Sequence, residues 1–138
     1  MSAPVRGHIK APTADDELGL GTGRPDEGFG LEISRMFAAT TAMVDGGYTV
    51  IGKPAGLDFN NVWWYDVGLG QDLAGDRVNI SVFFEEYRAI VPGLANARDI
   101  LAALTLKGGG WQLQLSGEFG LSDGAPDRGF TFGASRRF

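Results

Sequence analysis

The sequence predicts an all-β protein, an antiparallel up-and-down transmembrane β-barrel of about eight strands that occupies residues 1–138 as a single domain. Three observations predict it. Segments of roughly nine to eleven residues alternate apolar and polar side chains, as strands do when their two faces meet different surroundings. The connections between these segments alternate between short and long. The chain ends on an alternating segment closed by Phe138.

The composition excludes several classes of protein. No run approaches the roughly 20 apolar residues of a membrane-spanning helix, and 22 glycines disfavour long helices. The net charge of −5 argues against nucleic acid as a partner, because phosphate binding needs clustered Lys and Arg. The absence of cysteine removes disulfides and thiolate-ligated metal sites.

The expected strands follow from the alternation, taken in chain order. Residues 5–10 form a weak first candidate, and segments near 29–37, 41–51, 61–71, 78–87, 100–106, 111–122 and 130–138 follow. The clearest is 111–122, where odd positions are apolar or glycine and even positions are polar or small, a pattern that a helix would mix. The apolar side chains expected to share one face are Phe29, Leu31, Ile33, Phe37; Ala42, Val44, Tyr48, Val50; Trp63, Tyr65, Val67, Leu69; Val78, Ile80, Val82, Phe84; Ile100, Ala102, Leu104, Leu106; Leu113, Leu115, Phe119, Leu121; and Phe130, Phe132, Ala134, Phe138.

The connections support the same topology. Short ones are expected at 38–40, 73–76 and 107–110, and longer ones at 11–27, 52–60, 91–98 and 123–128. Outer-membrane barrels place short turns on the periplasmic side and longer loops outside. An even number of strands then brings both chain ends to the short-turn side.

The polar face is expected to line the interior of the barrel. Its predicted lumen-lining residues are Glu32, Asp45, Asp66, Glu85, Tyr87, Gln112, Gln114, Glu118 and Arg137. With Arg6, Lys10 and Lys107 they would form ion pairs that fill a narrow eight-stranded barrel. In a wider barrel the same residues would line a water-filled route that favours cations.

The apolar face is expected to meet lipid. Aromatic rings near strand ends match the girdles at which hydrocarbon meets headgroups. The predicted lipid-facing or girdle residues are Phe37, Trp63, Tyr65, Trp111, Phe119 and Phe138. Arg35 and Arg136 also fall on this face, but near the short-turn end, where an outward Arg costs only about 0–1 kcal/mol.

The last segment, GFTFGASRRF, resembles the terminal strand that the barrel-assembly machinery of the outer membrane recognises. Gly133 and Phe138 match its pattern, whereas Arg136 stands where a hydrophobic residue is usual. The pieces KAPTADDELGLGTG, GYTVIGKPAG, NNVWWYDVGLG and FGLSDGAPDRGFTFG are similar to outer-membrane transporters associated with degradation of phenol or other aromatic compounds. Members of such families tend to be longer, which leaves open a complete small barrel or the C-terminal part of a larger one.

The sequence therefore predicts a non-enzymatic passive channel or transporter for small molecules in the bacterial outer membrane. The first residues lack the apolar stretch of an export signal. We expect the lipid bilayer, the assembly machinery and small solutes as partners, and no catalytic residue, cofactor or metal. Two alternatives remain: a soluble β-barrel that holds a small apolar ligand, and a membrane-embedded lipid-modifying enzyme that uses His8 or an inward serine.

Overall fold

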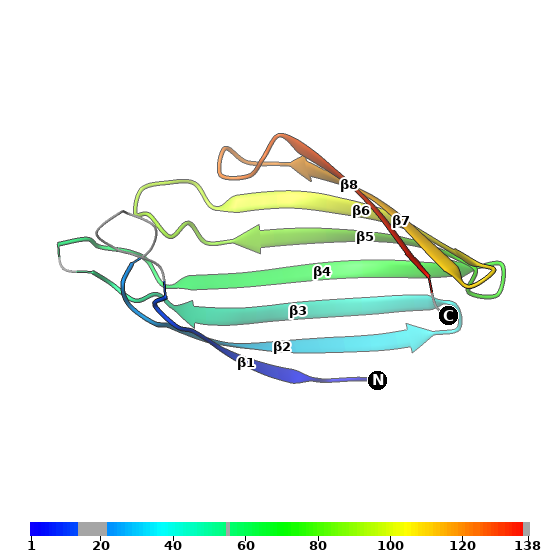
Figure 1. Cartoon of the computed structure of the whole chain (residues 1–138), viewed down its shortest axis with the longest axis horizontal. Helices are drawn as coiled ribbons and strands as arrows, with labels where there is room; N and C mark the ends of the chain where they lie inside the picture. The colour runs from blue at the N-terminus through cyan, green and yellow to red at the C-terminus, as the bar shows by residue number, and fades with distance from the viewer. Residues whose placement is uncertain (14–21, 55, 137–138) are drawn as a thin grey trace.

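A computed structural model describes residues 1–13, 22–54 and 56–136 of the chain. These residues form one antiparallel sheet in which every strand pairs with the next strand along the chain (Figure 1). The eight strands are β1 (Val5–Lys10), β2 (Asp26–Phe37), β3 (Thr40–Val50), β4 (Val62–Leu73), β5 (Val78–Tyr87), β6 (Ala97–Gly108), β7 (Trp111–Gly120) and β8 (Arg128–Arg136). The predicted all-β, up-and-down antiparallel fold is confirmed.

The sheet is curved but open. In Figure 1, β7 and β8 run obliquely across the ends of the central strands, while β1 lies at the opposite edge. Among the described residues β1 pairs only with β2, and β8 pairs only with β7. The sequence predicted a barrel. The described strands form an open trough, and its closure into a barrel stays a prediction.

Short and long connections lie at opposite ends of the strands. The connections at 38–39, 74–77 and 109–110 lie at one end, together with the N-terminus and the end of β8, and the longer ones lie at the other end (Figure 1). Gly109 and Gly110 have φ values of 56° and 80°. Two consecutive positive φ values match the tight turn that suits the twist of paired strands, and glycine adopts them without steric cost. The predicted alternation of connection lengths agrees with this arrangement.

One face of the sheet is apolar across all eight strands. The strand register aligns its side chains in rows, for example Ile33, Val44 and Val67, then Phe84 and Ile100. Val44, Val67 and Ile33 are 50%, 47% and 43% exposed. No described hydrophobic side chain is buried, and nothing within the described residues covers this face, which we call the apolar face.

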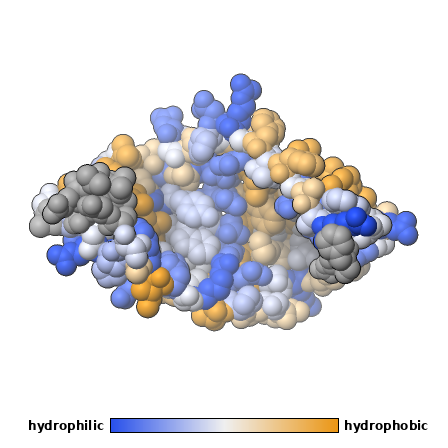
Figure 2. Space-filling view, viewed as in Figure 1, coloured by the Kyte–Doolittle hydropathy of each residue, from blue (hydrophilic) through white to orange (hydrophobic). Residues whose placement is uncertain are grey.

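The opposite face, which we call the polar face, is the hollow side of the trough. Its Asp26, Asp45 and Asp99 are the buried polar residues of the described chain, at 8%, 6% and 5% exposure. A curved sheet shields the side chains on its inner side, so the burial of these carboxylates identifies the polar face as concave. Figure 2 shows pale and hydrophilic residues in the hollow, with hydrophobic residues around it. In the described part of the chain no helix is long and apolar enough to cross a membrane.

Candidate functional site

The polar face gathers the side chains that the sequence assigned to an interior. The register places on this face, as expected, Glu32, Asp45, Asp66, Glu85, Tyr87, Gln112, Gln114 and Glu118. Arg137 lies outside the described residues. Gln112 and Gln114 are exposed because β7 lies next to the open edge. That the polar face lines an aqueous lumen stays a prediction.

Five carboxylates form a straight line across the middle of the polar face. Each is the direct register partner of the next, and we call this line the acidic row: Glu32, Asp45, Asp66, Glu85 and Asp99. Directly opposed residues in an antiparallel pair have Cα atoms about 4.5–5.5 Å apart, and like charges placed so close destabilise the pairing. Five strands therefore share an unfavourable row that a purely structural sheet would avoid.

Asp99 is the member of the acidic row that the sequence analysis missed. The predicted sixth strand began at residue 100, whereas β6 begins at Ala97 and includes Asp99. Asp99 directly precedes Ile100 and continues its alternation, whereas Arg98 falls on the apolar face and breaks the pattern. Asp99 was therefore the only signal that the strand starts earlier. Its pairing with Glu85 depends on the register, which the alternation of one strand does not reveal.

A cation reaches the acidic row from the edge of the sheet. Arg6 on β1 forms an ion pair with Asp45 on β3, two strands away. The Arg6 guanidinium also lies 5.7 Å from the ring centroid of Trp64 on β4. Contacts across two and three strands require a concave surface, and a cation over an indole face is attracted by its quadrupole.

Glycine makes room for the Trp64 ring. A Cβ atom at Gly47 would lie 2.7 Å from Trp64 Cζ2, and one at Gly30 would lie 3.2 Å from the same atom. The indole therefore lies over neighbouring strands that have no side chain at these positions. On its other side Trp64 stacks with Tyr87 at 6.1 Å between centroids and 18° between planes. This aromatic pair borders the acidic row.

The other basic side chains of the polar face lie away from the centre of the row. Lys10 Nζ lies 3.2 Å from Asp26 Oδ2 near the long connections. His8 is exposed on β1, opposite Gly28. Lys107 lies near the short turns. The centre of the acidic row therefore keeps an excess of negative charge.

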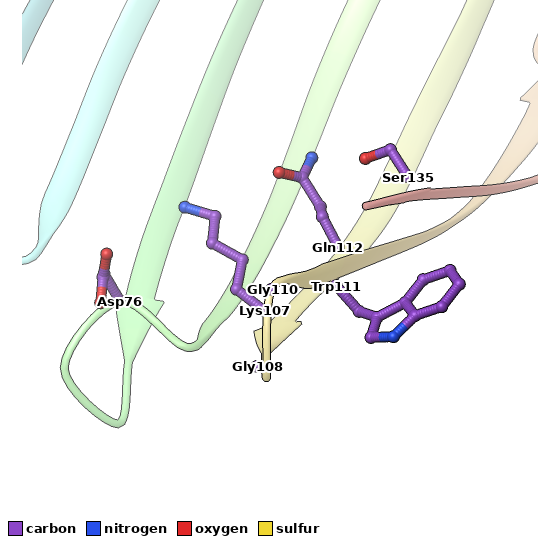
Figure 3. Close-up of a pocket in the computed structure, with 7 residues that line it drawn as sticks. All are labelled: Asp76, Lys107, Gly108, Gly110, Trp111, Gln112 and Ser135. Atoms are coloured by element: carbon purple, nitrogen blue, oxygen red, sulfur yellow. The ribbon is translucent and has the colours of Figure 1, made fainter. Parts of the chain in front are cut away.

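At the short-turn end a hollow of about 340 Å³ opens between β6, β7 and β8 (Figure 3). In Figure 3 the side chains of Lys107, Gln112 and Ser135 point to one side and Trp111 points to the other. The remaining lining residues are Asp76, Gly108 and Gly110. This hollow lies next to the open edge of the sheet, away from the acidic row.

Aromatic residues are concentrated toward the ends of the strands on the apolar face. The register places on this face Phe37, Trp63, Tyr65, Trp111 and Phe119, whereas Phe138 lies outside the described residues. Trp63 and Tyr65 stack at 6.1 Å, and Phe119 meets Phe130 edge to face at 6.2 Å. That these rings meet lipid stays a prediction.

The two arginines that departed from the apolar pattern lie at the short-turn end of this face. The Arg35 guanidinium lies 4.8 Å from the Phe37 ring, and that of Arg136 lies 5.4 Å from Trp111. At the opposite end Glu86 accepts hydrogen bonds from Arg98 Nε at 3.1 Å and from the Tyr65 hydroxyl at 2.8 Å. Charged groups therefore lie at both ends of the apolar face, and the band between them carries no charge.

Comparison with known proteins gives no further guide to this site. No protein-family model matches the chain, and no curated protein matches it either. The resemblance to outer-membrane transporters therefore stays a prediction that depends on the quoted sequence pieces.

Proposed function

We propose that this chain forms an outer-membrane β-barrel, or the part of one that contains these strands, through which small solutes diffuse passively. The observation that carries the proposal is the apolar face, which extends without interruption across eight strands and has no covering layer within the described residues. In water an apolar surface of this extent would drive aggregation. Acyl chains are the surroundings that such a face fits.

The height of the apolar band supports a bilayer. Glu27 and Arg35 mark its ends on β2, and Arg128 and Arg136 mark them on β8. At roughly 3.3 Å per residue, each pair is about 26 Å apart along its strand, which corresponds to about 20 Å along the membrane normal for a strand tilted by about 40°. The apolar band of outer-membrane barrels is about 25 Å tall, and charged arginine heads extend away from it.

The polar face supports a hydrated route. Burying the acidic row in a dry interior would cost several kcal/mol per unpaired ion, whereas water in a lumen solvates it. Rings of carboxylates favour cations over anions in such pores. Because a bilayer offers no water to an unpaired strand edge, the edges of β1 and β8 must pair in the membrane, with each other or with further strands.

A soluble carrier of an apolar ligand requires the opposite curl. Its apolar face would surround the ligand, whereas Leu115 and Phe119 are 53% and 47% exposed on the outer side of the trough. The polar Asp45 and Asp99 are the shielded residues. Evidence that the protein is a soluble carrier would therefore refute the proposed membrane barrel.

Extraction from cells tests the proposal. The full chain is expressed with an export signal, and we expect it in the outer-membrane fraction, released only by detergent. Its electrophoretic band should shift on heating, because a folded barrel resists unfolding by dodecyl sulfate at room temperature. Recovery as a soluble monomer without detergent would refute the membrane assignment.

Conductance in a planar bilayer then tests the route. The purified protein should give steps of conductance whose reversal potential in a salt gradient indicates a preference for cations. Asp45→Asn combined with Asp99→Asn should reduce that preference, since both carboxylates lie on the polar face. An inserted protein without conductance would leave a membrane barrel but refute the channel.

A further inference from the structure

Four side chains on the two central strands, toward the long-connection end of the polar face, form a compact group of two rings and two carboxylates. They lie on β4 and β5, and we call them the central square: Trp64, Asp66, Glu85 and Tyr87. Trp64 opposes Tyr87 and Asp66 opposes Glu85 in the register. Its sides are therefore about 5 Å across the strands and about 7 Å along them.

The carboxylates of the central square are half-buried and lack partners of their own. Among the described residues, neither Asp66 nor Glu85 takes part in an ion pair or accepts a side-chain hydrogen bond. Asp66 Oδ1 is buried without a hydrogen-bond partner. A buried acceptor without a donor costs about 1–3 kcal/mol, so an outside group with N–H donors and positive charge would relieve it.

The same face binds a cation of this kind one strand away. Asp45, the next member of the acidic row, is paired with the Arg6 guanidinium, which also lies over the other side of the aromatic pair at Trp64. Arg6 thus combines a carboxylate with a ring, as an organic cation bound in the central square would. The Arg6 guanidinium forms its ion pair with Asp45, whereas Asp66 has no ion pair within the described residues.

A bare metal ion fits the central square less well. The described residues contain no group of three or more carboxylate, histidine or cysteine side chains placed to hold a metal. Ca²⁺ takes six to eight oxygen ligands and Mg²⁺ demands a near-ideal octahedron. A planar cation instead uses two carboxylates and a ring face at once.

We propose that the central square binds a planar organic cation of the guanidinium or amidinium class. Two carboxylates accept its N–H groups, and the Tyr87 ring, which is 39% exposed, contacts its flat side. The inference deepens the proposed function and rests on it, because it names a class of solute that would pause in the lumen. It requires that the polar face be open to small molecules.

Titration of the purified full chain with benzamidine tests the inference, with neutral benzamide as the isosteric control. Calorimetry is carried out at low ionic strength, in whichever medium keeps the protein folded, because salt screens the attraction. We expect benzamidine to bind at least tenfold more tightly than benzamide. Equal affinity for the two compounds would overturn the proposal.

Matched variants locate the binding. Asp66→Asn and Glu85→Gln should each weaken benzamidine binding at least fivefold while circular dichroism stays unchanged. Asp72→Asn is the control, since Asp72 lies on the same face of β4 but bonds Asn79 near the short turns. If Asp72→Asn weakens binding as much as Asp66→Asn, the attraction is diffuse and the site is refuted.

The aromatic part has its own control. Tyr87→Leu should weaken benzamidine binding several-fold, whereas Trp63→Leu, on the opposite face, should leave it unchanged. Equal effects of the two variants would overturn the role of the ring. If the protein binds benzamidine but is soluble without detergent, only the membrane barrel is refuted. If it inserts and conducts but does not bind benzamidine, only the binding site at the central square is refuted.

Discussion

Arg6 on the edge strand β1 is ion-paired with Asp45 on β3 across the intervening β2. Asp45 is 6% exposed, whereas the Arg6 side chain is 52% exposed. The ion pair therefore joins a shielded carboxylate to a solvent-exposed guanidinium. It also links β1, which pairs with another strand on one side only, to the concave face.

Arg6→Ala should destabilise the fold by about 1–2 kcal/mol, because it leaves Asp45 shielded and without its cation. The solvent exposure of Arg6 keeps the effect below that of a fully buried pair. Unfolding in urea measures the change. The double variant Arg6→Gln/Asp45→Asn should recover most of the loss, and additive losses would contradict a coupling between the two residues.

Glu85→Gln should stabilise the sheet by roughly 0.5–1 kcal/mol, because it removes one of the like charges that face each other across β4, β5 and β6. Glu86→Gln is the control, since Glu86 lies on the apolar face and is hydrogen-bonded to Arg98, Tyr65 and Asn96. This control should destabilise. A lower unfolding free energy for Glu85→Gln would show that the acidic row contains favourable contacts.

Val67→Arg should reduce stability in lipid by about 2–4 kcal/mol, because Val67 lies midway along β4 on the apolar face. Leu73→Arg, on the same face but at the short-turn end, should cost only about 0–1 kcal/mol. Unfolding from lipid vesicles measures both. The two side chains are 47% and 43% exposed, so equal and small effects would indicate an aqueous rather than a lipid surface.

The open edges of β1 and β8 give a further prediction. Because the sequence contains no cysteine, introduced cysteines would be the only thiols that react. Cysteines introduced at Ile9 on β1 and at Phe132 on β8 should cross-link in the membrane through a flexible bifunctional reagent. A cross-linked monomer would indicate closure of eight strands, and a cross-linked dimer a wider barrel formed by two copies. If the protein inserts into the membrane but no reagent, whatever its spacer length, cross-links the two cysteines, pairing of the two edges is contradicted.

The alternation of the sequence predicted most of the fold, because side-chain period reports strand faces directly. β7 and β8 were expected at nearly their observed positions, and the apolar side chains named for β2 to β8 share one face in the strand register. Closure was not predictable in this way, since it depends on curvature summed over the sheet. A strand pattern also contains no record of how many strands complete a barrel.

The candidate site was predicted less completely. The sequence identified Asp66 and Glu85 as residues of one face, but only the register places them opposite each other. The alternation puts Trp64 on the same face as Asp66, but its stacking on Tyr87 depends on the room left by Gly47 and Gly30. Such a site depends on the register and the side-chain contacts between strands. A single sequence shows mainly the alternation of side chains within each strand.

The orientation of the two faces is tested most directly by single cysteines in the reconstituted protein. Leu104→Cys on the apolar face and Thr105→Cys beside it on the polar face differ by one residue of β6. A fluorophore attached in the Leu104→Cys variant should be quenched by brominated lipid, and the thiol of the Thr105→Cys variant should react with a membrane-impermeant reagent. Quenching at position 105 with aqueous reactivity at position 104, or aqueous reactivity at both, would contradict the account.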